Sequence, residues 1–67
     1  MLMPGEQIRL LRKERRITQE QLAEAMNVSV AAVSKWETGQ SAPELPLLCR
    51  IADYFAVSVD SLLGHEI

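Results

Sequence analysis

The most constraining feature of the sequence is a joint of only three residues, Asn27-Val28-Ser29, between two stretches with helical hydrophobic spacing. Asn27 tolerates the left-handed backbone conformation that a sharp turn needs, and Ser29 is a favourable N-cap for a following helix. A joint this short cannot reverse the chain into a long antiparallel hairpin. It therefore predicts two consecutive helices that cross at a steep angle.

Both of these helices carry sequence signals at their ends. Thr18 and Gln21 form a capping box at the start of the first helix, in which each side chain can bond the other residue's backbone amide. Its predicted buried face consists of Leu22, Ala23 and Met26. The second helix is predicted from Val30 to about Thr38, and Gly39 is its stop signal.

Three further short helices are predicted on either side of this pair. The N-terminal one covers about Glu6–Arg15, with Ile8 and Leu11 at helical spacing. A C-terminal one is capped by Ser58 and is expected to end at Gly64, with Leu62 and Leu63 as its apolar residues.

The fourth helix in chain order is predicted to begin at Glu44 or Leu45, with Pro46 in its first turn, where a missing amide costs little. Its expected apolar stripe is Leu45, Leu48, Ile51, Ala52 and Phe55. The chain has 67 residues and shows no internal repeat, low-complexity tract or linker. The prediction is therefore one compact all-α domain of five helices over residues 1–67.

Charge is distributed unevenly along the chain. The net charge is −2, but residues 1–17 hold five basic and two acidic residues, a net of +3, and residues 18–67 hold two basic and seven acidic residues, a net of −5. A basic face that meets nucleic acid is therefore compatible with an acidic total. The alternative is that the arginines around residues 12–16 form an ordinary solvated helix face.

Several classes of site find no support in the sequence. A single cysteine, Cys49, excludes an internal disulfide, fits a reducing cytoplasmic setting and is expected to be a small buried apolar residue. The lone His65 stands in no metal-ligand spacing, and neither a catalytic pair nor a phosphate loop is present. No stretch approaches the length of a membrane span, and the N-terminus lacks the charge order of a signal peptide. We therefore expect no metal, no cofactor, no membrane association and no enzymatic activity.

The helix predicted over Val30–Thr38 has two unlike sides. On a helical wheel, one arc of roughly 140° holds small, polar and cationic residues and no acid, given 3.6 residues per turn. These residues are Val30, Ala31, Ser34, Lys35 and Thr38. Such a side would allow close approach to the DNA major groove, with polar groups for base edges or phosphates and methyl groups for thymine. The alternative is a weakly amphipathic surface helix without a partner.

Glu37 falls on the opposite, packed side of that helix, together with Ala32, Val33 and Trp36. A carboxylate there needs a cationic or amide partner to remain charged. The arginines of the N-terminal helix are the nearest supply, so we expect an Arg–Glu bridge between the two helices. The alternative is that Glu37 reaches solvent.

These motifs together resemble the phage-repressor-like helix-turn-helix family, also called the Xre or Cro type. The pattern comprises Thr18-Gln19, Leu22-Ala23, the short turn, Ser34-x-Trp36-Glu37-x-Gly39, Pro43 and Val57-Ser58-x-Asp60-x-Leu62-Leu63. The resemblance covers nearly the whole chain. It implies a lambda-repressor-like fold, a helix-turn-helix at about 18–38, and a transcriptional regulator, expected to be a repressor, that binds double-stranded DNA through a recognition helix at Val30–Thr38.

The resemblance also implies a role for individual residues. The base-reading positions fall on Val30, Ala31, Ser34 and Lys35. Phosphate contacts are implied for Thr18, Gln19, Ser29, Thr38, Gln40 and Ser41. Trp36 is expected first to pack at the helix boundary, and its indole N–H is a further candidate for a phosphate contact. The arginine that pairs with the glutamate of the recognition helix falls on Arg12, opposite Glu37.

The sequence departs from the family pattern in two respects. The turn residue is Asn27 where glycine is frequent, and asparagine takes the same backbone conformation. The base-reading positions lack the Gln, Asn and Arg side chains that make bidentate base contacts. Affinity would then depend on a homodimer, with the helix around Val57–Leu63 as the expected dimer surface, and on DNA shape. The alternative function is a protein-interaction module, or antitoxin-like partner, that keeps the fold and binds DNA weakly or not at all.

Overall fold

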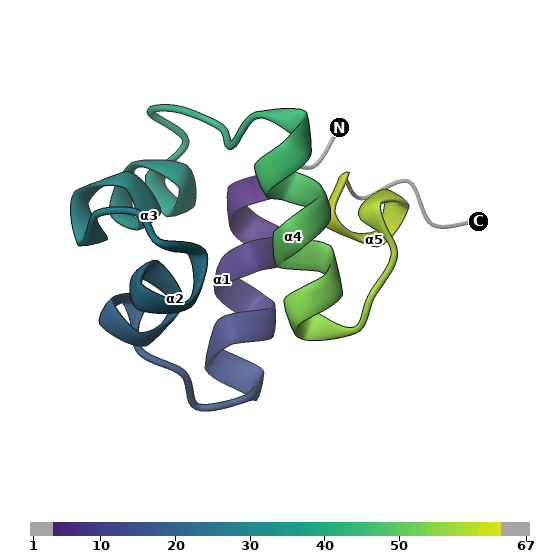
Figure 1. The fold of residues 1–67 in the computed structure, drawn as a ribbon, viewed down its shortest axis with the longest axis horizontal. Coiled ribbons are helices and arrows are strands. Elements are labelled where there is room, and N and C mark those ends of the chain that lie inside the picture. The colour runs from purple at the N-terminus through teal and green to yellow at the C-terminus, as the bar shows by residue number, and fades with distance from the viewer. Residues whose placement is uncertain (1–3, 64–67) are drawn as a thin grey trace.

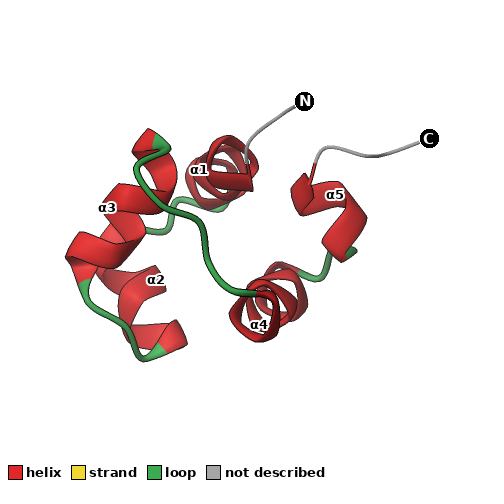
Figure 2. Cartoon of the chain, turned by 90° about the horizontal axis from the view of Figure 1, so that it is seen from above, coloured by secondary structure: helices red, strands yellow, loops and turns green. Residues whose placement is uncertain are grey.

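The computed structural model describes residues 4–63, and within that range the chain is all-helical. The helices are α1 (Pro4–Glu14), α2 (Gln19–Met26), α3 (Val30–Thr38), α4 (Leu45–Phe55) and α5 (Val59–Leu63). In two perpendicular views α1 and α4 occupy the centre, with α2 and α3 on one side and α5 on the other (Figures 1 and 2). The predicted all-α fold of five helices is confirmed; Gly64 and His65 lie outside the described residues.

The ends of α2 and α3 follow the predicted capping signals. The Gln21 backbone amide donates to Thr18 Oγ1 at 3.0 Å, and the Thr18 amide donates to Gln21 Oε1 at 2.8 Å. The Ala32 amide donates to the hydroxyl of the N-cap Ser29 at 3.1 Å. Asn27 ends α2 with a φ of 59°. The three-residue joint therefore has the cap chemistry at both ends that fixes the turn between the two helices.

The core is formed by one face of each helix. Its fully or almost fully buried apolar residues are Ile8, Leu22, Ala23, Met26, Val33, Trp36, Leu48, Ile51, Ala52, Phe55 and Leu62. The predicted inner face of α2 is thus confirmed. Val33 and Trp36 place one side of α3 in this core, so the other side of α3 faces solvent.

Two predictions for α4 are wrong. Leu45 was expected in the apolar stripe, but it is 66% exposed. Cys49 was expected to be buried and is also exposed. Leu45 and Cys49 are four residues apart, so both lie on the same side of α4. That side is turned away from buried Leu48 and Ile51.

The first helix begins and ends earlier than predicted, at Pro4 and Glu14 rather than at Glu6 and Arg15. Proline fits the first turn of a helix because its missing amide would have no intrahelical partner. Arg15 instead reaches the end of α4, where its Nη2 donates to the Phe55 carbonyl oxygen at 2.8 Å. Its guanidinium carbon also lies 5.3 Å from the centre of the Phe55 ring. Arg15 therefore ties α1 to the C-terminus of α4 and satisfies one of its free carbonyls.

A close backbone contact joins the start of α1 to the end of α3. Gly5 is buried, and a Cβ atom built on it would stand 1.7 Å from the Trp36 carbonyl oxygen and 2.6 Å from the Trp36 carbonyl carbon. Only a residue without a side chain permits this approach. The contact fixes the C-terminal end of α3 against α1. It was not predicted from the sequence.

Candidate nucleic-acid interface

The exposed side of α3 carries the residues that the helical wheel placed there. Val30 is 40% exposed; Ala31, Lys35 and Thr38 are exposed, and Ser34 is half-buried. On the opposite side Val33 is completely buried. The result is a surface of short side chains with one cation and no acid. We call these five residues the α3 face.

Polar groups border the α3 face, most of them near its C-terminal end. Thr18 is exposed and Gln19 half-buried at the start of α2, and Gln40 and Ser41 are exposed in the segment after α3. The Thr38 hydroxyl donates to the Ser34 carbonyl oxygen at 3.1 Å. That bond directs the Thr38 hydrogen inward. Ser29 is exposed, but its hydroxyl oxygen already accepts the amide of Ala32.

Trp36 is a packing residue, as predicted, and is only 5% exposed. No hydrogen bond is found for its indole N–H among residues 4–63, and in the same range no buried side-chain nitrogen or oxygen lacks a partner. The indole N–H is the only polar group of this side chain, and it can donate one hydrogen bond.

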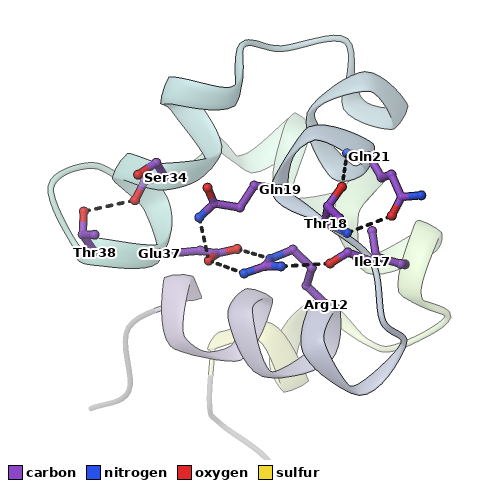
Figure 3. A network of polar contacts seen from close by, with 8 residues as sticks. All are labelled: Arg12, Ile17, Thr18, Gln19, Gln21, Ser34, Glu37 and Thr38. Carbon is purple, nitrogen blue, oxygen red and sulfur yellow. Dashed lines mark hydrogen bonds and ion pairs between the residues drawn. The ribbon is translucent and has the colours of Figure 1, made fainter.

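A polar network lies behind the α3 face and joins three helices (Figure 3). Arg12 holds Glu37 with two bonds, from Nε to Oε2 at 2.7 Å and from Nη2 to Oε1 at 2.9 Å. The Arg12 side chain is 12% exposed and the Glu37 side chain 4%. Arg12 Nη1 also donates to the Ile17 carbonyl oxygen at 2.9 Å. This is the Arg–Glu bridge expected from the sequence, and it is bidentate.

Gln19 completes this network in a way that the sequence did not predict. Its Nε2 donates to Glu37 Oε1 at 3.0 Å, although only a phosphate contact was expected of it. The bond ties the first residue of α2 to the last turn of α3. A glutamine at a helix start carries no signal for such a contact, because the partner lies 18 residues further along the chain.

The surroundings of Glu37 include one effect that raises its pKa and several that lower it. Burial favours the neutral acid and raises the pKa, but hydrogen bonds from Arg12 and Gln19, with the positive charges of Arg12 and Arg9, outweigh burial. The pKa of the Glu37 carboxyl therefore lies below its ordinary value of 4.5. The hydrogen bond to Glu37 correspondingly raises the pKa of Arg12. The pair is ionised at neutral pH.

This shift predicts a pH dependence of folding stability. Because the pKa of Glu37 is lower in the folded chain than in the unfolded chain, its contribution is fully present above the ordinary value of 4.5 and is lost as the pH falls through the folded-state pKa. We expect Glu37→Gln to lose this part of the acid dependence. Urea unfolding at pH 3–7 would measure it, with exposed Glu24→Gln as the matched control. Parallel curves for wild type and Glu37→Gln would contradict the shift.

Other kinds of site are not supported by the described part of the chain. Within residues 4–63 no three His, Cys, Asp or Glu side chains gather in a way that could hold a metal ion. Over the same residues no helix has the length and apolar character needed to cross a bilayer.

Comparison with known proteins identifies the family. A helix-turn-helix family model matches residues 8–62. The HTH-type transcriptional activator BcrR of Enterococcus faecalis is 44% identical over 62 residues, which are 92% of this chain and 30% of that protein. The immunity repressor protein of Bacillus phage phi105 is 36% identical over 62 residues, 92% of this chain and 43% of that protein. The chain thus spans less than half the length of these curated relatives.

A solved structure has the same fold at similar sequence identity. The P22 c2 repressor protein, in complex with synthetic operator 9T, superposes with a TM-score of 0.88 at 32% identity. The match covers 98% of this chain and all of that chain. The phage-repressor-like fold predicted from the sequence motifs is therefore confirmed.

Proposed function

We propose that this chain, which belongs to the helix-turn-helix family, binds double-stranded DNA as the DNA-binding domain of a transcriptional regulator. The observation that carries the proposal is the α3 face: small and cationic, free of acid, and held from behind by the Arg12–Glu37–Gln19 network. The likeness to a repressor in complex with its operator supports the same conclusion. Repression by occupation of an operator, in the cytoplasm, is the expected mode of action.

In this proposal α3 enters the major groove. Val30 and Ala31 offer methyl groups for the C5-methyl of thymine, and Ser34 and Lys35 offer donors to base-edge acceptors. The short side chains allow the helix backbone to approach the base edges closely. Because none of these residues makes a bidentate base contact, part of the specificity comes from the shape and deformability of the operator.

The flanking polar groups are proposed to contact the phosphates and set the orientation of α3. At the start of α2 the contacts are those of Thr18 and Gln19, whose Nε2 keeps a second hydrogen beyond the one given to Glu37. Ser29 would make a contact at the N-terminal end of α3. Trp36, Thr38, Gln40 and Ser41 would make contacts near its C-terminal end, Thr38 once its hydroxyl has turned from the Ser34 carbonyl oxygen. Such contacts fix register and carry no sequence information directly.

Lys35→Ala is expected to weaken binding to every duplex, because it removes a cation from the α3 face. The slope of log affinity against log salt should become less steep by about 1. Ser34→Ala, which keeps the charge, is the matched control and should change preference between sequences instead. Fluorescence anisotropy at several salt concentrations measures both. Unchanged nonspecific affinity of Lys35→Ala at low salt would show that the proposed orientation of α3 is wrong.

The proposed function is tested by selecting bound duplexes from a random pool at low salt. We expect a palindrome, because we propose that the chain acts as a homodimer through the region around α5, Val57–Leu63. The two half-sites should be about one helical turn apart, roughly 10 base pairs. If the recovered duplexes share no consensus sequence, the chain binds DNA through phosphate contacts alone. No bound DNA would favour the alternative, a protein-interaction module or antitoxin-like partner that keeps the fold.

A further inference from the structure

The phosphate contacts proposed above are made entirely by uncharged side chains. The α3 face itself supplies one cation, Lys35, in a chain with a net charge of −2. Affinity for duplex DNA comes mainly from cations that replace condensed counterions at the phosphates. Further cations are therefore needed beside the α3 face.

A cleft of about 330 Å³ lies directly beside that face. It opens between α1, the start of α2 and the end of α3, and its lining residues are Arg9, Arg12, Lys13, Gln19, Glu37 and Thr38. Thr38 belongs to the α3 face, so the cleft and that face are continuous. Three of the lining side chains are cationic and one is anionic, a net of +2 for the cleft.

The two excess charges belong to particular residues. Arg12 and Glu37 neutralise each other in the bidentate pair. Arg9 and Lys13 are exposed, stand one helical turn apart on α1, and make no ion pair or side-chain hydrogen bond within residues 4–63. By contrast Arg15, just beyond the end of α1, bonds the Phe55 carbonyl and is committed to the fold.

We propose that this cleft is a phosphate-binding site for the DNA backbone, in which Arg9 and Lys13 of α1 bind a phosphodiester that also meets the Gln19 amide group. The inference rests on the proposed DNA-binding function and extends it to a helix outside the helix-turn-helix. The Arg12–Glu37 pair has a structural role in this site, because it positions Gln19. The excess positive charge of the cleft then comes from Arg9 and Lys13, which have no ion-pair partner among residues 4–63. The site contributes affinity to every sequence alike.

The experiment measures binding of a 30-base-pair duplex of arbitrary sequence to the full chain between 20 and 200 mM salt. The test variants are Arg9→Gln, Lys13→Gln and the double variant. The matched control is Arg50→Gln, which removes an exposed cation of α4; no residue of α4 lines the cleft. Thermal unfolding of each variant checks that the fold is retained. Little change is expected, since both side chains are exposed and pair with no other residue of the described range.

We expect the salt slope to become less steep by about 0.9 for each phosphate interaction that a substitution removes, which corresponds to about eightfold weaker binding per interaction at 0.1 M salt. Arg50→Gln should bind like the wild type. If the double variant binds with the affinity and slope of the wild type, the cleft is not a phosphate site, while the proposed function stands. If Arg50→Gln weakens binding as much as Arg9→Gln, the effect is one of net charge and the site is likewise refuted. If the wild type itself binds no duplex, both proposals fail.

Discussion

Gly5→Ala is expected to destabilise the domain by about 3 kcal/mol, at the upper end of the usual cost of overpacking. In an open helix the same change would stabilise, because alanine has the higher helix propensity by about 1 kcal/mol. Here the new methyl group would stand 1.7 Å from the Trp36 carbonyl oxygen. Backbone atoms cannot rotate away as a side chain can, so α1 and α3 must separate and the core between them must loosen.

A loss of this size is readily measured in a chain of 67 residues. It corresponds to a decrease in Tm of roughly 12–24 °C, since 1 kcal/mol shifts a domain of this size by about 4–8 °C. The only tryptophan in the chain, Trp36, supplies a fluorescence signal from the contact itself. Glu6→Ala, at the neighbouring exposed position, is the control and should stay within about 0.5 kcal/mol of wild type. A Gly5→Ala variant as stable as Glu6→Ala would show that the two helices do not approach as closely as described.

The features that were predicted correctly from the sequence depend on interactions between residues close together in the chain. The capping box at Thr18, the N-cap at Ser29 and the left-handed ends at Asn27 and Gly39 each involve residues within a few positions of one another. The two sides of α3 followed from its helical period alone. The partner of Glu37 could be predicted because a buried carboxylate requires a cation, and the family resemblance directed that expectation to Arg12.

The features that could not be predicted from the sequence depend on how the helices pack against one another. Gly5 looks like any glycine near a helix start, and only the crossing of α1 and α3 makes its missing side chain necessary. Arg16 and Ala56 take left-handed conformations, with φ of 56° and 58°, at positions where the residue type gives no indication of it. Leu45 fits the hydrophobic period of α4, but it lies at the edge of the apolar stripe, four residues before exposed Cys49, and is itself exposed. The hydrophobic period of a helix indicates which side faces the core. Which residues on that side are buried depends on how the neighbouring helices pack against it.

Arg12→Met is expected to cost about 1–3 kcal/mol, the range for leaving a largely buried polar group without its partner. This is less than the cost of breaking a fully buried ion pair, because both side chains line a cleft that opens to solvent. The variant keeps a long apolar stem but leaves the Glu37 carboxylate, 4% exposed, with Gln19 as its one remaining hydrogen-bond donor among the described residues. The Ile17 carbonyl also loses its bond from Arg12 Nη1. Much of the cost therefore arises from desolvated groups left without partners, and less from the attraction between the two charges.

The double variant Arg12→Met/Glu37→Met separates these two contributions. Replacing both members of a buried pair with apolar residues of similar volume is often neutral or stabilising, so we expect the double variant to recover most of the loss. Urea unfolding of the wild type, both single variants and the double variant completes the thermodynamic cycle. If Arg12→Met alone costs less than about 1 kcal/mol, the pair behaves as a solvent-screened surface bridge. In that case the network would not hold the end of α3 against α1 and α2, and the position of the α3 face would depend on the Gly5 contact and the core alone.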